Sequence, residues 1–243
     1  MKMEQELQEY INILLCKPEG QIGRDYLKQR KISKQTAIEW KMGYCPVGFT
    51  PTVYSNESYN FWKKLWGRVV FPIYDSNGNL ISISGRKVID VQDREKNPKY
   101  DHYPFNARKT LFGLWQNKKE IFNENTAIIT EGQLDVITAW QKGIKIVTSS
   151  FGAHCGEDHL IVLNRYTSNI IVMYDNDDAG TKGINKTKQI SRHSKIPVKF
   201  KCPFPNGLDM DSWLQNHTKE EFYKILNYDK MSYLTNKLNK MIK

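Results

Sequence analysis

The chain has 243 residues, of which 36 are Lys or Arg and 26 are Asp or Glu, so its formal net charge is +10. This length accommodates one large domain or two small ones. The positive balance suits a polyanionic partner, although solubility alone would also explain it. No apolar run approaches the roughly 20 residues that span a bilayer, and residues 1–10 lack the apolar core of a signal peptide. We therefore expect a soluble protein of the cytoplasm with no membrane partner.

Four helical or irregular segments are expected in the first 60 residues. Apolar residues recur at helical spacing over 4–15, which predicts a surface helix that ends near Pro18. Residues 23–41 fit two short helices joined by a turn, with Ser33 as the N-cap of the second helix. The segment 50–60 is rich in Ser, Thr, Asn and Pro and is expected to be a loop.

A β-hairpin is the clearest feature of the next stretch. The strand-like runs 68–74 and 80–84 are joined by residues 75–79, whose Asn77-Gly78 pair is a strong hairpin signal. Residues 87–109 are irregular and basic, with aromatic residues interleaved. Such a segment can bind phosphates and stack on bases, but a solvated loop has the same composition.

The second half alternates short apolar strands with helical stretches. Strands are predicted over 126–130, 144–148, 170–173 and 197–202, with helices after the first three. This alternation indicates a parallel α/β sheet with right-handed crossovers. Residues 205–211 form a predicted turn, and 212–243 are helical in pattern and rich in Lys, which suits a solvated face or a binding surface.

The predicted parallel sheet would gather acids at one edge. Glu131, Asp175 with Asp177, and Asp209 with Asp211 all follow predicted strands. One acid after one strand is more often a helix cap, but three strand ends carrying acids are harder to explain in that way. Asp135, four residues after Glu131, is expected one helical turn further on, as an outer ligand or only a first-turn charge.

The chemistry of these acids predicts a divalent metal site. Crowded carboxylates repel one another unless a cation neutralises them, and oxygen donors suit Mg²⁺ or Mn²⁺. Two such ions would stabilise the attacking and leaving oxygens of a phosphoryl displacement. The four Cys residues are scattered, without C-x-x-C pairs, so no zinc or disulfide framework is expected; the grouping of His154, Cys155 and His159 lacks a second cluster.

These motifs resemble a known family. Glu131-Gly132 after one strand, and Asp175-x-Asp177-x-Ala179-Gly180 after another, resemble the Toprim domain of primases, topoisomerases, recombination proteins and some nucleases. Upstream, residues 67–75, the hairpin end Ser84-Gly85-Arg86, and the segments 98–100 and 111–114 are similar to the N-terminal half of the DnaG-type primase core. The resemblance covers about residues 20–215.

The resemblance implies an α/β fold in three parts: a mixed α/β N-terminal subdomain over 1–115, a Toprim parallel sheet with flanking helices over 116–211, and a short helical tail over 212–243. It implies synthesis of short RNA primers on a single-stranded DNA template from ribonucleoside triphosphates, with Mg²⁺ or Mn²⁺, two ions in all. The implied metal ligands are Glu131, Asp175 and Asp177, with Asp135, Asp209 and Asp211 assisting. The implied residues of the basic groove for template and nucleotide are Arg68, Arg86, Lys99 and Lys109.

The chain departs from the family in ways that affect its partners. There is no room for the family's zinc-binding and helicase-binding domains, so a replicative helicase and a separate zinc-binding protein are expected partners. The compact form suggests a phage or mobile element, acting in the bacterial host cytoplasm, or a core fragment. Residues 149–154 and Ser84 also differ from the usual pattern. A Toprim-type metal-dependent nuclease and a non-catalytic, single-strand-binding replication adaptor remain alternatives.

Overall fold

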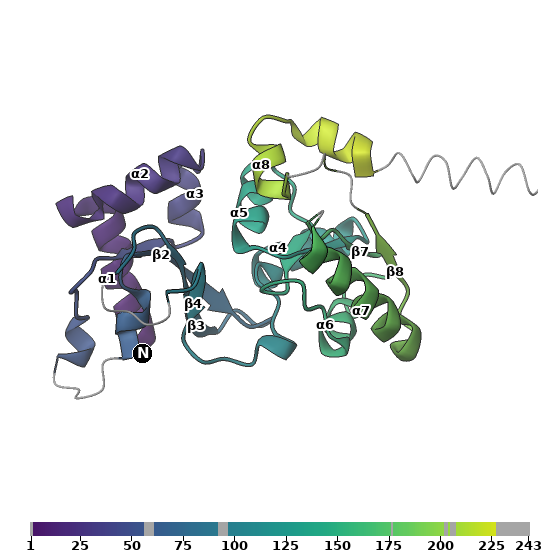
Figure 1. Ribbon diagram of the computed structural model, residues 1–243, viewed down its shortest axis with the longest axis horizontal. Coiled ribbons are helices and arrows are strands. Elements are labelled where there is room, and N and C mark those ends of the chain that lie inside the picture. Colours follow the sequence, from purple (N-terminus) through teal and green to yellow (C-terminus); the bar gives the residue numbers. More distant parts are fainter. Residues whose placement is uncertain are drawn as a thin grey trace, which may run out of the picture. The chain divides into compact units, whose positions relative to one another are not determined.

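The computed structural model describes residues 2–55, 61–91, 97–175, 177–201, 204 and 208–226. The chain forms two compact units, Met1–Trp115 and Gln116–Lys243 (Figure 1). The further division of the second unit into a Toprim domain and a tail stays a prediction. Within the described ranges, no helix is long and apolar enough to cross a membrane.

The helices of the first unit follow the predicted order. They are α1 (Lys2–Cys16), α2 (Gln21–Gln29) and α3 (Lys34–Glu39), with a 3₁₀ turn, η1 (Pro18–Gly20), between the first two. The predicted N-cap is confirmed, because the Ser33 hydroxyl accepts a hydrogen bond from the backbone N–H of Thr36 at 3.0 Å. Arg24 satisfies the end of α1 by donating to the carbonyls of Leu14 (2.7 Å) and Lys17 (2.9 Å).

The sheet of the first unit is antiparallel throughout. Its strands are β1 (Gly43–Cys45), β2 (Arg68–Tyr74), β3 (Leu80–Lys87) and β4 (Tyr100–His102), in spatial order β1-β2-β3-β4. The predicted hairpin is confirmed as β2 and β3, with Gly78 at φ +92° in its turn. β4 lies inside the stretch expected to be irregular, because pairing with β3 supplies backbone hydrogen bonds that its polar sequence does not signal.

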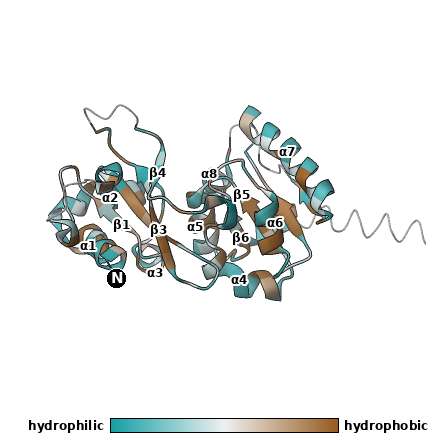
Figure 2. Ribbon diagram, turned by 90° about the horizontal axis from the view of Figure 1, so that it is seen from below, coloured by the Kyte–Doolittle hydropathy of each residue, from teal (hydrophilic) through white to brown (hydrophobic). Residues whose placement is uncertain are grey.

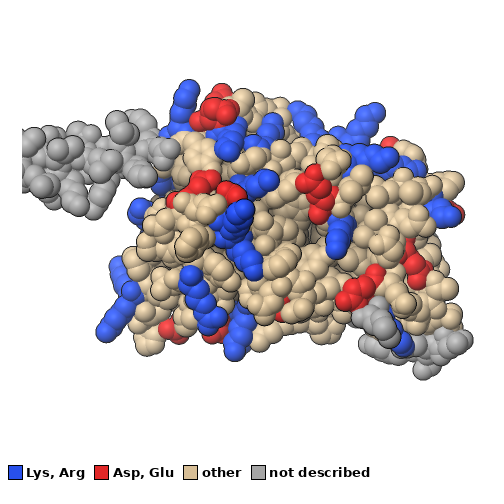
Figure 3. All heavy atoms as spheres, turned by 180° about the vertical axis from the view of Figure 1, so that it is seen from behind, with Lys and Arg blue, Asp and Glu red and all other residues tan. Residues whose placement is uncertain are grey.

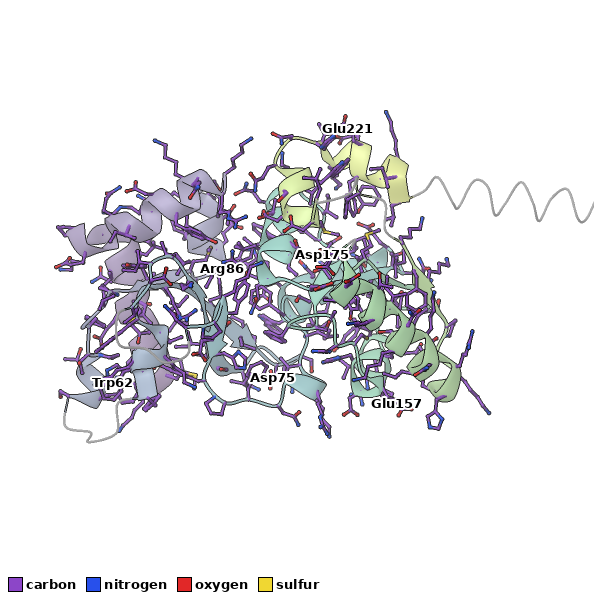
Figure 4. The ribbon with its side chains drawn as sticks, viewed as in Figure 1. Trp62, Asp75, Arg86, Glu157, Asp175 and Glu221 are labelled. Carbon is purple, nitrogen blue, oxygen red and sulfur yellow. The ribbon has the colours of Figure 1, made fainter. Side chains whose placement is uncertain are left out.

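Short 3₁₀ turns connect the elements of this unit. These are η2 (Thr52–Tyr54), η3 (Phe61–Leu65) and η4 (Ala107–Lys109). η2 lies in the stretch 50–60 that was expected to be a loop, of which residues 56–60 lie outside the described residues. Trp62 of η3, labelled in Figure 4, is 1% exposed and stacks on Tyr54 with ring centroids 5.2 Å apart. The first unit therefore has an aromatic core beneath its sheet.

The sheet of the second unit is parallel, as predicted. Its strands β5 (Ala127–Thr130), β6 (Val147–Ser149), β7 (Ile170–Val172) and β8 (Val198–Phe200) lie in the order β6-β5-β7-β8. β6 begins three residues later than predicted, because residues 144–146 form a turn after α5. β5 and β7 are buried along their whole length, and Figure 2 shows the hydrophobic colouring of β5.

Helices connect or flank the strands of this sheet. The helices α5 (Gln133–Gln141), α6 (Glu157–Leu163) and α7 (Asp178–Ser194) connect its strands, whereas α4 (Leu114–Asn123) precedes β5 and α8 (Met210–Leu214) follows β8. Residues 219–226 are also helical, so the predicted helical pattern after 212 is present where the chain is described. The helix α8 packs against α5 (Figure 1). The α/β class with a helix-flanked parallel sheet is therefore confirmed.

Candidate active site

Two of the predicted acids meet at the carboxyl edge of the parallel sheet. Glu131 follows β5 directly, and Asp175 follows β7, the neighbouring strand. One Glu131 carboxylate oxygen, Oε1, accepts a hydrogen bond from the backbone N–H of Asp175 at 3.1 Å. Both residues are partly exposed. Figure 4 labels Asp175 at this position in the second unit. Because β5 and β7 are parallel neighbours, Glu131 and Asp175 are in contact although they lie 44 residues apart in the sequence.

The helix α7 closes this edge of the sheet. Asp177 is its N-cap, and its Oδ1 accepts from the backbone N–H of Gly180 at 2.7 Å. A Cβ at Gly180 would lie 2.1 Å from the Asp175 carbonyl oxygen and 3.1 Å from Oε1 of Glu131. Only glycine allows the first turn of α7 to lie so close to both acids. Asp178, the first residue of α7, is exposed.

A second group of acids lies deeper. Asp135 is only 5% exposed, and its carboxylate accepts from the backbone N–H groups of Gly132 and Asp211, each at 3.0 Å. Burial, reinforced by the negative charges of Asp209 and Asp175, raises the pKa of Asp135 well above its usual range. Asp135 does not lie one helical turn beyond Glu131, because α5 begins only at Gln133.

The remaining two acids hold α8 in place. Asp209 is the N-cap of α8, with its Oδ1 accepting from the backbone N–H of Ser212 at 2.8 Å. Asp211 is 2% exposed and accepts from the Thr138 hydroxyl of α5 at 2.6 Å. Thr138 was not singled out from the sequence. Its position three residues after Asp135, on the same face of α5, is the signal that could have indicated it.

The donor set suits a hard divalent cation. The residues at this edge offer carboxylate oxygens, and the negative charges of Asp209 and Asp175 add to the burial that raises the pKa of Asp135; a divalent cation would relieve that repulsion. Among the residues that the structure describes, no three or more His, Cys, Asp or Glu side chains are grouped so that they could hold a metal ion. The acids therefore fit the metal by donor chemistry, and their assignment as ligands stays a prediction.

Ser149, the last residue of β6, and the loop that follows it hold the Glu131 backbone in place. The Ser149 hydroxyl and the Gly152 backbone N–H both donate to the Glu131 carbonyl oxygen, at 2.7 and 2.8 Å. The Tyr174 hydroxyl accepts from the backbone N–H of Cys155 at 2.9 Å. Phe151 and Gly152 have φ values of 59° and 123°, so the loop follows an unusual path. From the sequence, Ser149 was noted only as part of the unusual turn 149–154, and Tyr174 was not singled out.

In the group His154, Cys155 and His159, two members have structural roles: Cys155 is buried, and His159 caps a helix. Cys155 is 1% exposed, and burial raises the pKa of its thiol to about 12. The Nδ1 atom of His159 accepts from the backbone N–H of Gly156 at 3.1 Å, which satisfies the first turn of α6. Cys16, Cys45 and Cys155 are free thiols, and Cys202 lies outside the described residues.

Arg68 of the first unit does not have the accessibility expected of a groove residue. It is fully buried, and its guanidinium donates to the Gly85 carbonyl (3.2 Å) and to Oδ1 of Asn97 (2.8 Å). A Cβ at Gly85 would lie 2.9 Å from Cδ of Arg68, so glycine makes room for this side chain. The expectation of direct contact with a ligand is corrected here, because Arg68 instead joins β2 to β3 and to the segment before β4.

The other predicted groove residues are accessible. The Arg86 guanidinium lies over the Tyr100 ring, 5.0 Å from its centroid, on adjacent positions of β3 and β4. Lys99 and Lys109 are exposed. Figure 4 labels Arg86, and Figure 3 shows that Lys and Arg side chains are dispersed over the visible face with acids among them. The role of Arg86, Lys99 and Lys109 in binding stays a prediction.

Comparisons with known proteins cover both units. Residues 49–118 match the family described as the N-terminal domain of the DNA primase catalytic core, and residues 128–214 match the Toprim-like family. A DNA primase of Enterococcus faecalis is 29% identical over 255 residues, a match that covers 95% of this chain and 40% of that protein. The chain thus spans less than half the length of this relative.

Two solved structures are similar to this chain. A structure of the DnaG catalytic core has a TM-score of 0.80 and 25% identity, covering 93% of this chain and 78% of that one. A DnaG primase catalytic domain bound to single-stranded DNA has a TM-score of 0.79 and 24% identity, covering 93% and 79%. The fold of the two units, and their order along the chain, are therefore those of these catalytic cores.

Proposed function

We propose that this chain, which has the DnaG-type DNA primase catalytic core with a Toprim domain, synthesises short RNA primers on single-stranded DNA by metal-dependent nucleotidyl transfer. The observation that carries the proposal is the hydrogen bond between the Glu131 carboxylate and the backbone N–H of Asp175, at the carboxyl edge of the parallel sheet. It brings two acids to the edge of the sheet where ligands of such folds bind.

The acids have separate tasks in this proposal. Glu131, Asp175 and Asp177 would hold Mg²⁺ or Mn²⁺, while Asp135, Asp209 and Asp211 assist from the deeper layer. Two bound ions would stabilise the attacking 3′ oxygen and the departing pyrophosphate. The contribution of the chain itself is rigidity. Gly180 allows α7 to lie close to both acids, and the Ser149 hydroxyl fixes the Glu131 backbone. The carboxylates would therefore keep their places during the reaction.

The first unit would hold the template and the incoming nucleotide. Arg86, stacked on Tyr100, presents a cation beside an aromatic surface, and Lys99 and Lys109 supply exposed charges for phosphates. The solved DnaG domain bound to single-stranded DNA supports this partner. A replicative helicase and a separate zinc-binding protein complete the proposed set of partners, and the proposed setting is the replication of a phage or mobile element in the cytoplasm of its bacterial host.

Primer synthesis is the direct test. The protein is incubated with single-stranded DNA templates of varied sequence, labelled ribonucleoside triphosphates and Mg²⁺ or Mn²⁺, and the products are separated by gel electrophoresis. We expect short RNA products that disappear with EDTA. Absence of products on every template, even with a zinc-domain protein added, would contradict the proposal.

The two alternatives give different results in the same assay. A Toprim-type nuclease would degrade DNA with metal alone, without nucleotides. An adaptor would bind single strands and retain its function after replacement of Asp175 and Asp177 by Ala. The Arg86–Tyr100 pair is compatible with both alternatives, so only the dependence on nucleotides and on the acids separates them.

A further inference from the structure

The segment 179–201 contains β8 and all of α7 after its first residue, Asp178, and it carries positive charge with no acid. It contains seven Lys or Arg residues and no Asp or Glu, whereas the whole chain has 26 acids in 243 residues, about one in nine. The seven are Lys182, Lys186, Lys188, Arg192, Lys195, Lys199 and Lys201. A helix on a solvated surface normally mixes both signs, so this one-sided composition needs a reason.

Two glycines and a threonine fix which side of α7 faces solvent. Gly180, Gly183 and Thr187 are its buried residues. A Cβ at Gly183 would lie 2.7 Å from the Ala153 Cβ atom and 3.0 Å from the Tyr174 ring. The helix is therefore in contact with the protein along this row and cannot rotate, and its opposite side faces outward.

The outward side of α7 consists of cations and amides. Lys182 and Lys186 are four residues apart and form one stripe, while Lys188 and Arg192 form a second stripe with the same spacing. Asn185 and Gln189 lie between the stripes, and all six side chains are exposed. We call these six residues the α7 basic face. It offers hydrogen-bond donors and positive charge over about 15 Å of helix from Lys182 to Arg192.

The positive charge of the α7 basic face is not neutralised by ion pairs among the described residues. Among the described residues, no ion pair involves Lys182, Lys186 or Arg192. Lys188 lies 5.4 Å from the centroid of the Phe200 ring, which leaves its charge in place. Each like-charged pair at i,i+4 destabilises a helix by roughly 0.2–0.5 kcal/mol. The helix dipole favours Arg192 in the last turn of α7, and Lys188 gains its contact with the Phe200 ring, but no ion pair in the described part of the chain neutralises Lys182, Lys186 or Arg192. The face is therefore available to an external anion.

We propose that the α7 basic face binds the sugar–phosphate backbone of a nucleic-acid duplex, the hybrid of new primer and template. The inference rests on the proposed function, because the hybrid is the product of that reaction. Asp177 is the N-cap of α7, so the basic face of this helix starts beside the candidate active site and leads away from it within the same unit. A product duplex leaving the acids would meet these cations next.

The chemistry of the face favours a duplex over a single strand. Its six residues include no aromatic ring on which an unpaired base could stack, in contrast to the Arg86–Tyr100 pair of the first unit. Lys, Arg, Asn and Gln side chains contact phosphate oxygens without reading sequence. A B-form duplex carries one charge per roughly 1.7 Å of axis, so about 15 Å of helix meets a dense row of phosphates.

The test compares two triple variants with equal loss of charge. The first is Lys182→Gln with Lys186→Gln and Arg192→Gln. The matched control is Lys119→Gln with Lys224→Gln and Arg165→Gln, three exposed residues of the same unit outside α7. Fluorescence anisotropy measures the affinity for a labelled 12-base-pair RNA–DNA hybrid and for the single DNA strand, from 50 to 200 mM salt. Circular dichroism checks folding.

We expect the α7 variant to bind the hybrid about 10- to 50-fold more weakly, and its plot of log K against log salt to flatten by roughly two to three units. The control variant should change hybrid affinity less than threefold, and single-strand affinity should change less than twofold in both. Equal weakening of hybrid binding in both variants would contradict the assignment of this binding to the α7 basic face. An equal loss of single-strand affinity in the α7 variant would overturn the duplex as its partner.

Two further measurements keep the result independent of folding and of catalysis. In the wild-type protein, the hybrid should protect Lys182 and Lys186 from chemical acetylation while leaving Lys119 and Lys224 reactive; unchanged reactivity of all four would overturn the proposal. Binding is measured without nucleotides. A wild-type protein that makes no primers but binds the hybrid through α7 would therefore contradict the proposed function and leave this surface intact.

Discussion

Each unit of the protein contains a buried carboxylate, and the surroundings of the two differ. Glu6, on α1 of the first unit, is fully buried and accepts hydrogen bonds from the hydroxyls of Tyr10 (2.7 Å), Tyr54 (3.1 Å) and Tyr103. Asp135, on α5 of the second unit, accepts from two backbone N–H groups but lies in the negative field of Asp209 and Asp175.

The two carboxylates differ in the neighbours that act on their pKa. Burial is the main cause that raises the pKa of both groups. At Glu6 three tyrosine hydroxyls oppose the shift and the charge of Glu9 adds to it, whereas at Asp135 two backbone N–H groups oppose the shift and the charges of Asp209 and Asp175 add to it. Glu6 is thus satisfied by the unit in which it lies, and it links α1, η2 and the segment after β4. The proposed divalent cation would offset the negative charge around Asp135.

Replacing Glu6 by Ala should have the largest effect. It would leave three buried hydroxyls without their acceptor, at roughly 1–3 kcal/mol each before relaxation, so we expect a loss of about 4 kcal/mol in the free energy of unfolding. Urea unfolding followed by circular dichroism measures the loss. Glu39→Ala, at an exposed site on α3, is the control and should change stability by less than about 0.5 kcal/mol. Equal stability of the two variants would remove the structural role of Glu6.

Replacing Asp177 by Asn should affect catalysis and leave stability nearly unchanged. We expect primer synthesis to fall at least about 100-fold, equivalent to roughly 2.7 kcal/mol, because the charge of a proposed metal ligand is lost while the amide oxygen can still cap α7. Initial rates over a Mg²⁺ titration measure the loss. Asp178→Asn, at the next and exposed position, should change the rate less than threefold. Similar rates for the two variants would exclude Asp177 as a ligand.

Two arginines of the first unit also differ in their surroundings: Arg68 is buried, whereas Arg86 is accessible. Arg68→Met should reduce the free energy of unfolding by about 2 kcal/mol, because the Gly85 carbonyl and Asn97 lose a buried donor. Arg86→Gln should leave stability within about 0.5 kcal/mol and weaken single-strand binding about fivefold. Urea unfolding and fluorescence anisotropy measure the two effects. Weaker DNA binding by a fully stable Arg68→Met protein would restore Arg68 to the groove.

The pH dependence of stability should be the smallest effect. Because the pKa of Glu6 is raised from its ordinary 4.5, the folded protein keeps a proton over a range in which the unfolded chain has lost it. The free energy of unfolding should therefore fall as pH rises from 4.5 to the raised pKa, and then level off. Urea midpoints at several pH values measure this slope. In Glu6→Gln, the contribution of Glu6 should be absent; an unchanged slope would contradict it.

Local patterns in the sequence were sufficient for most elements. The spacing of apolar residues predicted α1, the Ser33 cap marked the start of α3, and Asn77-Gly78 located the hairpin. Such signals act within a few residues and need no tertiary context. β4 was missed for the opposite reason, since only its partner β3 makes Tyr100–His102 a strand.

The candidate site shows the same division. The sequence alone determined that acids follow parallel strands, because a run of apolar residues and the acids after it are adjacent in the chain. Tertiary structure decided the rest. It buried Arg68 against Gly85, set Thr138 against Asp211, and turned the cations of α7 outward by packing Gly183 on Ala153. Burial and long-range contacts depend on which surfaces meet, and no local spacing of residues contains that information.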